Sequence, residues 1–195
     1  MDRPAHLFDP DTGVVELVLY PFHLDRLHGR YLGPREDAAT CAGLPFPMLQ
    51  NSEPIRLCLT PGLTPEEIAA VSPFERNSSL GNRSWWRWHA YAWTPFGWST
   101  FPTPHFYSDR LGTITFGVHG SGSVEVRLNE VKSYVEAELG EPDEILCRGI
   151  ARNPTAKPGD RPDIIRWVRI WGVVTVCLEA RDHEPQMSIA WTRAA

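Results

Sequence analysis

The sequence lacks several features that would assign it directly to a functional class. No apolar run approaches the roughly 20 residues that a membrane-spanning helix needs, and the opening MDRPAHLFDPDTG has no apolar signal-peptide core. We therefore expect a cytoplasmic protein without a membrane partner. Lys and Arg number 19 against 24 Asp and Glu, for a formal net charge of −5. A nucleic-acid partner is not expected, because counterion release requires clustered basic residues.

Cysteine is scarce and forms no metal or redox motif. The four cysteines, Cys41, Cys58, Cys147 and Cys177, are far apart and include no C-x-x-C pair. Structural zinc sites and redox dithiols use closely spaced pairs. We therefore expect no metal, and thiols that are free and mostly buried.

Catalytic signatures are also absent. There is no Gly-x-Ser-x-Gly nucleophile elbow, and GVHGSG (117–122) lacks both the P-loop lysine and the glycine spacing of a dinucleotide site. His89, His105 and His119 fall on or near three expected strands and would form a ligand set if they converged. Histidines that are simply hydrogen-bonded are far commoner. We expect a protein that is not an enzyme and needs no cofactor.

Proline and glycine, in contrast, are abundant, with 18 and 15 residues that divide the chain into short elements. One helix is predicted to begin at Thr64, which can cap it, with Pro65 at the first helical position and Glu67 completing a capping box. It ends by Pro73, because the residue before a proline avoids helical geometry.

A second helix is predicted between Val124 and Leu139, where apolar residues recur at spacings of four and three. Gly140 and Pro142 end it. Its start is left open, either at Ser123 or at a cap on Asn129 with the preceding residues as the end of a strand.

Segments rich in β-branched and aromatic residues predict strands. They lie at 14–20, then after the first helix at 85–93, 97–101 and 111–118, and after the second helix at 163–171, 173–180 and 187–192. The order of one helix, a loop and three strands occurs twice, which is the pattern of an internal repeat. The predicted fold is α+β, with two tandem repeats, at 59–120 and 121–195, of one helix packed on a three- or four-stranded antiparallel sheet. Residues 1–58 form an N-terminal extension with one strand.

LTPEEIAAV (63–71) and LNEVKSYVEAELGEP (128–142) carry a resemblance to a known family. This arrangement is similar to β-lactamase inhibitory protein and to the related small outer-membrane assembly lipoproteins that carry one such repeat. The resemblance implies a sheet used as a binding face. That inhibitor is secreted and has a disulfide in each repeat, whereas here only Cys147 and Cys177 fall where such a bond would lie. Whether they pair is left open.

The stretch 84–101 holds five of the eight tryptophans. Alternate side chains of a strand point to opposite faces. One face of 85–93 carries Trp86, Trp88, Ala90 and Ala92, which can pack on a helix. The other face carries Trp85, Arg87, His89, Tyr91 and Trp93. Aromatic residues interleaved with polar ones are typical of protein-binding hot spots.

The strand predicted over 164–171 has a similar row, made of Ile165, Trp167, Arg169 and Trp171. Arg166 on the otherwise aliphatic opposite side leaves open which face is exposed. The candidate binding residues are therefore Trp85, Arg87, His89, Tyr91, Trp93, Trp167, Arg169 and Trp171. In the alternative interpretation these rows are core, because tryptophan and tyrosine favour strands and bury large areas.

These features favour a non-catalytic protein that binds and inhibits another protein. An immunity protein that neutralises a cognate bacterial toxin fits, since a net charge of −5 complements a basic target. One alternative is a small-molecule or carbohydrate-binding module that stacks its ligand on the aromatic face. The other is a small His-dependent enzyme.

Overall fold

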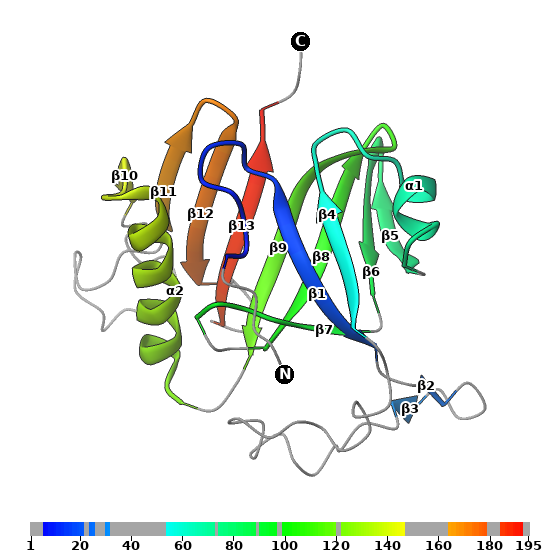
Figure 1. Cartoon of the computed structure of the whole chain (residues 1–195), viewed down its shortest axis with the longest axis horizontal. Helices are drawn as coiled ribbons and strands as arrows, with labels where there is room; N and C mark the ends of the chain where they lie inside the picture. Colours follow the sequence, from blue (N-terminus) through cyan, green and yellow to red (C-terminus); the bar gives the residue numbers. More distant parts are fainter. Residues whose placement is uncertain are drawn as a thin grey trace.

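A computed structural model describes residues 6–21, 24–25, 30–31, 54–72, 74–88, 90–96, 99–119, 122–146, 164–178 and 184–192. Its elements are β1 (Val15–Pro21), β2 (Leu24–Asp25), β3 (Arg30–Tyr31), β4 (Ile55–Leu59), α1 (Pro65–Ala69), β5 (Glu75–Leu80), β6 (Arg83–Arg87), β7 (Ala90–Trp93), β8 (Ser99–Tyr107), β9 (Arg110–His119), α2 (Val124–Leu139), β10 (Glu144–Leu146), β11 (Ile164–Arg169), β12 (Gly172–Leu178) and β13 (Pro185–Trp191) (Figure 1). Among these residues, no helix is both long and apolar enough to cross a membrane.

Eleven of the described strands form one sheet, whose order begins β10-β11-β12-β13-β9-β8. At β8 the sheet divides. His105 to Tyr107 pair with β6, which pairs in turn with β5, while Ser99 and Thr100 pair with β7. From β7 the order continues through β1 to β4. Figure 1 shows β1 and β4 in front of β8 and β9, on the same side as α2, so the sheet turns back over one of its own faces.

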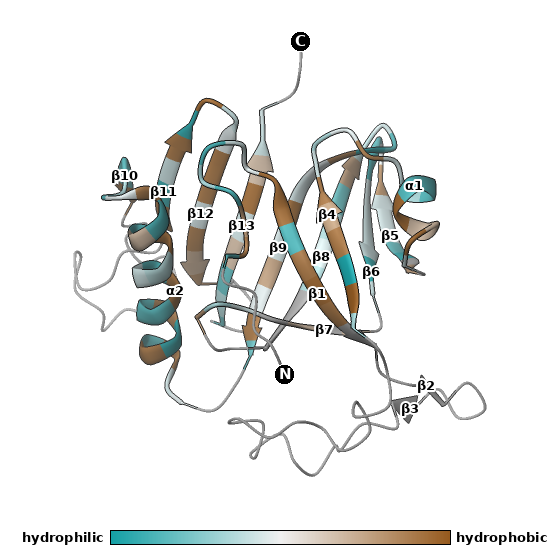
Figure 2. Cartoon of the chain, viewed as in Figure 1, coloured by the Kyte–Doolittle hydropathy of each residue, from teal (hydrophilic) through white to brown (hydrophobic). Residues whose placement is uncertain are grey.

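We call the face toward α2, β1 and β4 the inner face, and the opposite one the outer face. Burial alternates along the strands, as in β13, where Met187 and Ile189 are fully buried and their neighbours are not. One core joins inner-face residues of the sheet to Val131 and Val135 of α2 and to Leu17 of β1. Figure 2 shows hydrophobic residues alternating with hydrophilic ones along β1 and β4, as expected for strands with one buried face. The core therefore lies between the sheet and the elements that cover its inner face.

The first predicted helix begins as expected, and the structure decides the start of the second, which was left open. The Thr64 side chain accepts from the Glu67 N–H, and the Glu67 carboxylate accepts from the Thr64 N–H, which confirms the capping box. α2 begins after Ser123, whose hydroxyl accepts from the Val126 N–H, so the second possible start, at Asn129, is wrong. The chain leaves α2 at Gly140 with a φ of 80°, a conformation that favours glycine.

The predicted α+β fold of two tandem repeats is wrong. The structure is mainly β: α1 has only 5 residues, whereas α2 has 16. The strands of the two predicted copies belong to one sheet, because β13 of the second pairs with β9 of the first. The strand of the predicted extension, β1, pairs with both β4 and β7 and contributes to the core. The tandem architecture that the family resemblance implies is therefore not the one observed.

The single strand predicted over 85–93 is two strands, β6 and β7, which reach different partners. β8 extends further than predicted, through Pro102 and Pro104. Both prolines pair with β9 but lie between the β7-paired and β6-paired parts of β8. A missing N–H costs no ladder bond on a side where the strand has no neighbour, so the change of partners accommodates both prolines.

Candidate functional site

The second predicted row lies on the inner face, not on a surface. Trp167 is completely buried, and its indole Nε1 donates to the Gly140 carbonyl at 2.9 Å. Arg169 donates to the Leu139 carbonyl and, at 2.9 Å, to Asp143. The pKa of Asp143 is lowered, first by the hydrogen bond from the Val168 N–H and then by Arg169, against an opposing desolvation effect. Trp167 and Arg169 therefore hold the carboxyl end of α2.

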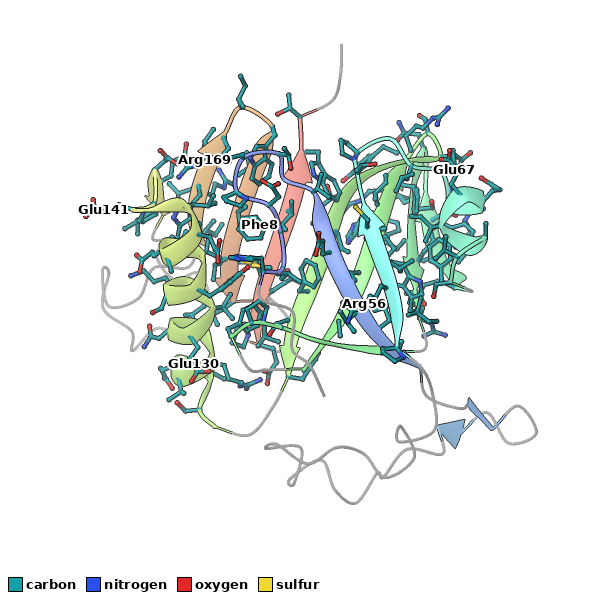
Figure 3. The ribbon with its side chains drawn as sticks, in the orientation of Figure 1. Phe8, Arg56, Glu67, Glu130, Glu141 and Arg169 are labelled. Atoms are coloured by element: carbon teal, nitrogen blue, oxygen red, sulfur yellow. The ribbon has the colours of Figure 1, made fainter. Side chains whose placement is uncertain are left out.

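Trp171, the third residue of that row, holds the N-terminal segment. Its indole donates to the Pro10 carbonyl at 2.9 Å, and the indole of Trp191 donates to the Gly13 carbonyl at 2.8 Å. Phe8 is fully buried, with its ring 6.2 Å from that of Trp171, and it lies between α2 and β1 in Figure 3. These contacts attach the carboxyl end of α2 and the N-terminal segment to the sheet. We name Trp167, Arg169, Trp171 and Trp191 the inner clamps.

The first predicted row is described only in part. Trp85 is half-buried and Arg87 is exposed, both on the outer face of β6. His89 lies outside the described residues, and for Tyr91 and Trp93 the structure describes the backbone in β7 but not the side chains.

The residues on the other face of 85–93 pack inward, as the alternation of side chains along a strand predicts. Trp88, Ala90 and Ala92 are buried, and Trp86 packs against the core. The ring of Trp88 stacks on Phe74, with centroids 5.2 Å apart. The tryptophan-rich stretch thus contributes to the core on one side and to the outer face on the other.

Trp85 belongs to a compact group on β6 and β8. The ladder places Arg83 opposite Tyr107 and Trp85 opposite His105, and paired residues share one face of a sheet. The Arg83 Cζ lies 4.7 Å from the centroid of the Trp85 ring and 5.2 Å from that of Tyr107. Arg83 Nη2 lies 2.7 Å from His105 Nδ1, and the Trp85 and His105 rings meet edge to face at 6.0 Å. We call these four residues the Arg83 cluster.

The contact with Arg83 determines which ring nitrogen of His105 carries the hydrogen. A guanidinium has no acceptor, so His105 Nδ1 must accept and, in the neutral ring, Nε2 must carry the hydrogen. Burial, and then the charge of Arg83, lowers the pKa of His105 to about 4, and the residue is only 8% exposed. Its Nε2 is buried with no acceptor among the described residues, and the same is true of Arg83 Nε.

The two histidines of the proposed set that the structure describes, His105 and His119, do not lie close together. His119 pairs with Ser99, six residues along β8 from His105, which separates the two histidines by about 20 Å. No group of three His, Cys, Asp or Glu side chains able to hold a metal occurs within the described part of the chain. Of the cysteines, Cys58 is exposed on β4, contrary to the expectation of burial. Cys147 lies outside the described residues, so its pairing with Cys177 stays untested.

A polar, partly exposed row crosses the middle of the outer face. Thr103, Thr115, Ser188 and Thr175 are in register across four neighbouring strands, and the row ends at Arg166 of β11. A row of hydroxyls is unsuited to burial under an apolar layer, because each group would lose its hydrogen bonds with water. This row therefore suits water or a polar partner.

No protein-family model matches the chain, and neither the curated proteins nor the solved structures compared with it include a match. The sequence pattern pointed to Trp85 but not to Arg83 or Tyr107, and His105 was considered only as a metal ligand or as part of a His-dependent enzyme. Two turn signals pointed to them. Gly81-Asn82 and Ser108-Asp109 are residues typical of tight hairpins, and they separate β5 from β6 and β8 from β9. Ser108 and Asp109 both have positive φ, of 50° and 57°.

Proposed function

We propose that this chain is a non-catalytic binding protein that contacts a partner protein through the outer face of β6 and β8. The observation that carries the proposal is the gathering of Arg83, Trp85, Arg87 and Tyr107 on that face. Tryptophan, tyrosine and arginine dominate the binding energy of protein interfaces. Beside them, the hydroxyl row offers hydrogen bonds of the kind that a polar rim supplies.

Two other functions have less support. A sugar-binding module needs an open aromatic ring face, whereas the Arg83 guanidinium already lies against the rings of both Trp85 and Tyr107. A histidine-dependent enzyme needs converging imidazoles, and those of His105 and His119 are far apart.

The local charge also refines the choice of partner. This part of the outer face presents Arg83, whereas exposed carboxylates lie on α2 and just beyond it, at Glu125, Glu130, Glu141 and Glu144. Figure 3 shows Glu130 and Glu141 on the far side of the molecule from α1. A partner at β6 and β8 would therefore present acidic groups. Neutralisation of a basic toxin, the role favoured by the overall net charge, would have to use the α2 side.

Affinity capture followed by titration tests the proposal. Wild-type protein captures a partner from native lysate, and the purified partner is then titrated against Trp85→Ala/Arg87→Ala. We expect the double variant to bind at least about tenfold more weakly, the range of interface hot spots.

Arg166→Ala is the matched control. Arg166 is also on the outer face, but it is five strands from β6, roughly 24 Å along the sheet. Its loss should leave the affinity unchanged. Recovery of no partner, or equal binding by wild type and by the correctly folded double variant, would refute the proposal.

A further inference from the structure

Arg83 differs from the other partly or fully buried arginines that the structure describes, each of which pairs with a carboxylate. Arg127 pairs with Glu184, Arg166 with Glu144 and Arg169 with Asp143. Arg83 instead contacts the neutral imidazole of His105 and the rings of Trp85 and Tyr107. Among the described residues, no carboxylate lies within ion-pair distance of its guanidinium. A partly buried cation without a counter-charge costs free energy that a bound anion would recover.

The cluster also contains hydrogen-bond donors that lack acceptors. Arg83 Nε and His105 Nε2 are both buried without a partner among the described residues. His105 is more than nine-tenths buried, and its ring is fixed by the bond from Arg83. Unpaired buried donors are rare in folded proteins and call for a specific explanation. Because Nδ1 of His105 faces Arg83, the Nε2–H of its ring points away from the guanidinium, so it is the unpaired Arg83 Nε beside the uncompensated charge that indicates where an oxygen acceptor binds.

We infer that the Arg83 cluster is a receptor for a carboxylate group, with the Arg83 guanidinium as its binding cation and Trp85, His105 and Tyr107 as its walls. One guanidinium supplies a single positive charge and a planar fork of donors, which match the single charge and two oxygens of a carboxylate. A phosphate dianion would leave one negative charge uncompensated. A net charge of −5 does not attract anions to the protein in general, so recognition must come from this local geometry.

An exposed apolar side chain beside the cluster identifies the source of the carboxylate. Leu80 of β5 lies directly opposite Arg83 in the ladder, on the same face, and is 76% exposed. A segment of a partner protein with an acidic side chain next to an apolar one would contact both residues, whereas a small free acid would leave Leu80 in water. This assignment of the source rests on the proposed function. The receptor itself does not.

NMR titration of the full chain tests the receptor, with the Arg83 Nε–H and His105 Nε2–H signals as reporters. Burial slows the exchange of these protons with water, so the signals are observable. Sodium acetate is titrated against sodium chloride at equal ionic strength. We expect saturable shifts with acetate alone, half-complete at about 1–50 mM, because a single charge-assisted pair gives weak binding. Absence of a saturable shift up to about 100 mM acetate would overturn the receptor.

Variants separate the receptor from general charge effects. Arg83→Gln should raise the half-saturating acetate concentration at least tenfold, while Arg166→Gln, on the same face, should leave it unchanged. Arg83→Lys keeps the charge but not the fork, and we expect it also to weaken binding. Equal acetate binding by wild type and a folded Arg83→Gln would overturn the assignment, as would inorganic phosphate binding tenfold more tightly than acetate.

Two probes distinguish the sources. The hexapeptide Ac-ELELEL-NH2 should bind at least tenfold more tightly than acetate, and Leu80→Ser should remove that advantage without changing acetate binding. Equal affinities would instead assign the site to a free acid and overturn the protein source. If a captured partner binds Arg83→Gln as tightly as wild type, the assignment of the carboxylate to that partner fails and the proposed function stands. If acetate saturates the site but no partner is ever captured, the proposed function fails and the receptor stands.

Discussion

The motif Trp-x-Arg occurs in two strands and has opposite roles in them. In β6 it places Trp85 and Arg87 on the outer face, whereas in β11 it places Trp167 and Arg169 against α2 and the core. The indole of Trp167 donates to the end of a helix. Trp85 instead contacts the guanidinium of Arg83 and the ring of His105, and no hydrogen bond from its indole to another described residue occurs.

The difference arises from what covers each strand. α2 packs on β12 and β13 and brings its carboxyl end to β11, so an indole there finds an unpaired backbone carbonyl. The β6 row faces away from the core, and its neighbours are side chains of β8. A short motif therefore does not determine its own role, because the element that packs on the strand decides whether the motif is part of the core or of the surface.

Truncating the two tryptophans should give the largest contrast. Trp167→Ala should lower the free energy of unfolding by about 3–5 kcal/mol, because it opens a cavity in the core and leaves the Gly140 carbonyl without its donor. Trp85→Ala should lower it by no more than about 1 kcal/mol, since Trp85 is partly exposed and loses only its cation–π contact with Arg83 and an edge contact with His105. Urea unfolding of both variants measures the difference. Similar losses would mean that Trp85 is a structural residue and not part of a binding surface.

The Arg83 cluster should also differ from the inner clamps in its response to pH. His105 has a folded pKa of about 4 against 6.5 for the free side chain. Above pH 6.5 it is neutral in both states. As the pH falls from 6.5 to 4, His105 becomes protonated in the unfolded chain but stays mostly neutral in the folded chain. This difference alone lowers the free energy of unfolding by about 3 kcal/mol.

His105→Gln isolates that contribution, because a glutamine carbonyl can accept from Arg83 but does not titrate. Urea unfolding of both proteins between pH 4 and 7 should show that the wild type loses stability more steeply. Asp9 and Asp143, whose pKa values are lowered mainly by backbone hydrogen bonds, affect the two proteins equally and cancel in the comparison. Parallel curves would show that His105 is not buried beside Arg83 in solution.

Local patterns were sufficient to predict the local elements. The capping box at Thr64, the carboxyl end of α2 and the strands near β1, β9, β11, β12 and β13 were each expected from the sequence. The inner position of Trp88, Ala90 and Ala92 followed from alternation alone. These features depend on residues within one turn of helix or one strand, so a single sequence contains the information.

Features that depend on distant partners were not predicted. The strands β4, β5 and β10 were missed, and the pairing of β13 with β9 has no local signal. For the same reason the sequence did not reveal which side of 164–171 is buried, since Ile165 and Ile170 are equally apolar yet are 1% and 95% exposed. The site was only partly predicted, because the Arg83 cluster forms through the register of β6 against β8.

The role of the inner clamps can also be tested by changing Gly13, a residue that lies against the ring of Trp171. Its φ is 70°, and an added Cβ would come within 2.3 Å of the Trp171 ring. Gly13→Ala should therefore lower the free energy of unfolding both by the cost of a left-handed alanine, about 1–2 kcal/mol, and by about 1–3 kcal/mol for forcing the ring away.

Gly62→Ala separates these two costs. Gly62 has a φ of 84°, but no atom lies within 4 Å of the position its Cβ would take. Gly62→Ala should therefore lose only the conformational cost of a left-handed alanine. The difference between the two losses in free energy of unfolding then measures the contact between the N-terminal segment and Trp171. If urea unfolding gives equal losses, the ring moves aside freely and Trp171 is not a clamp. A larger loss for Gly13→Ala would confirm that β11 uses its aromatic residues to hold the inner layer together.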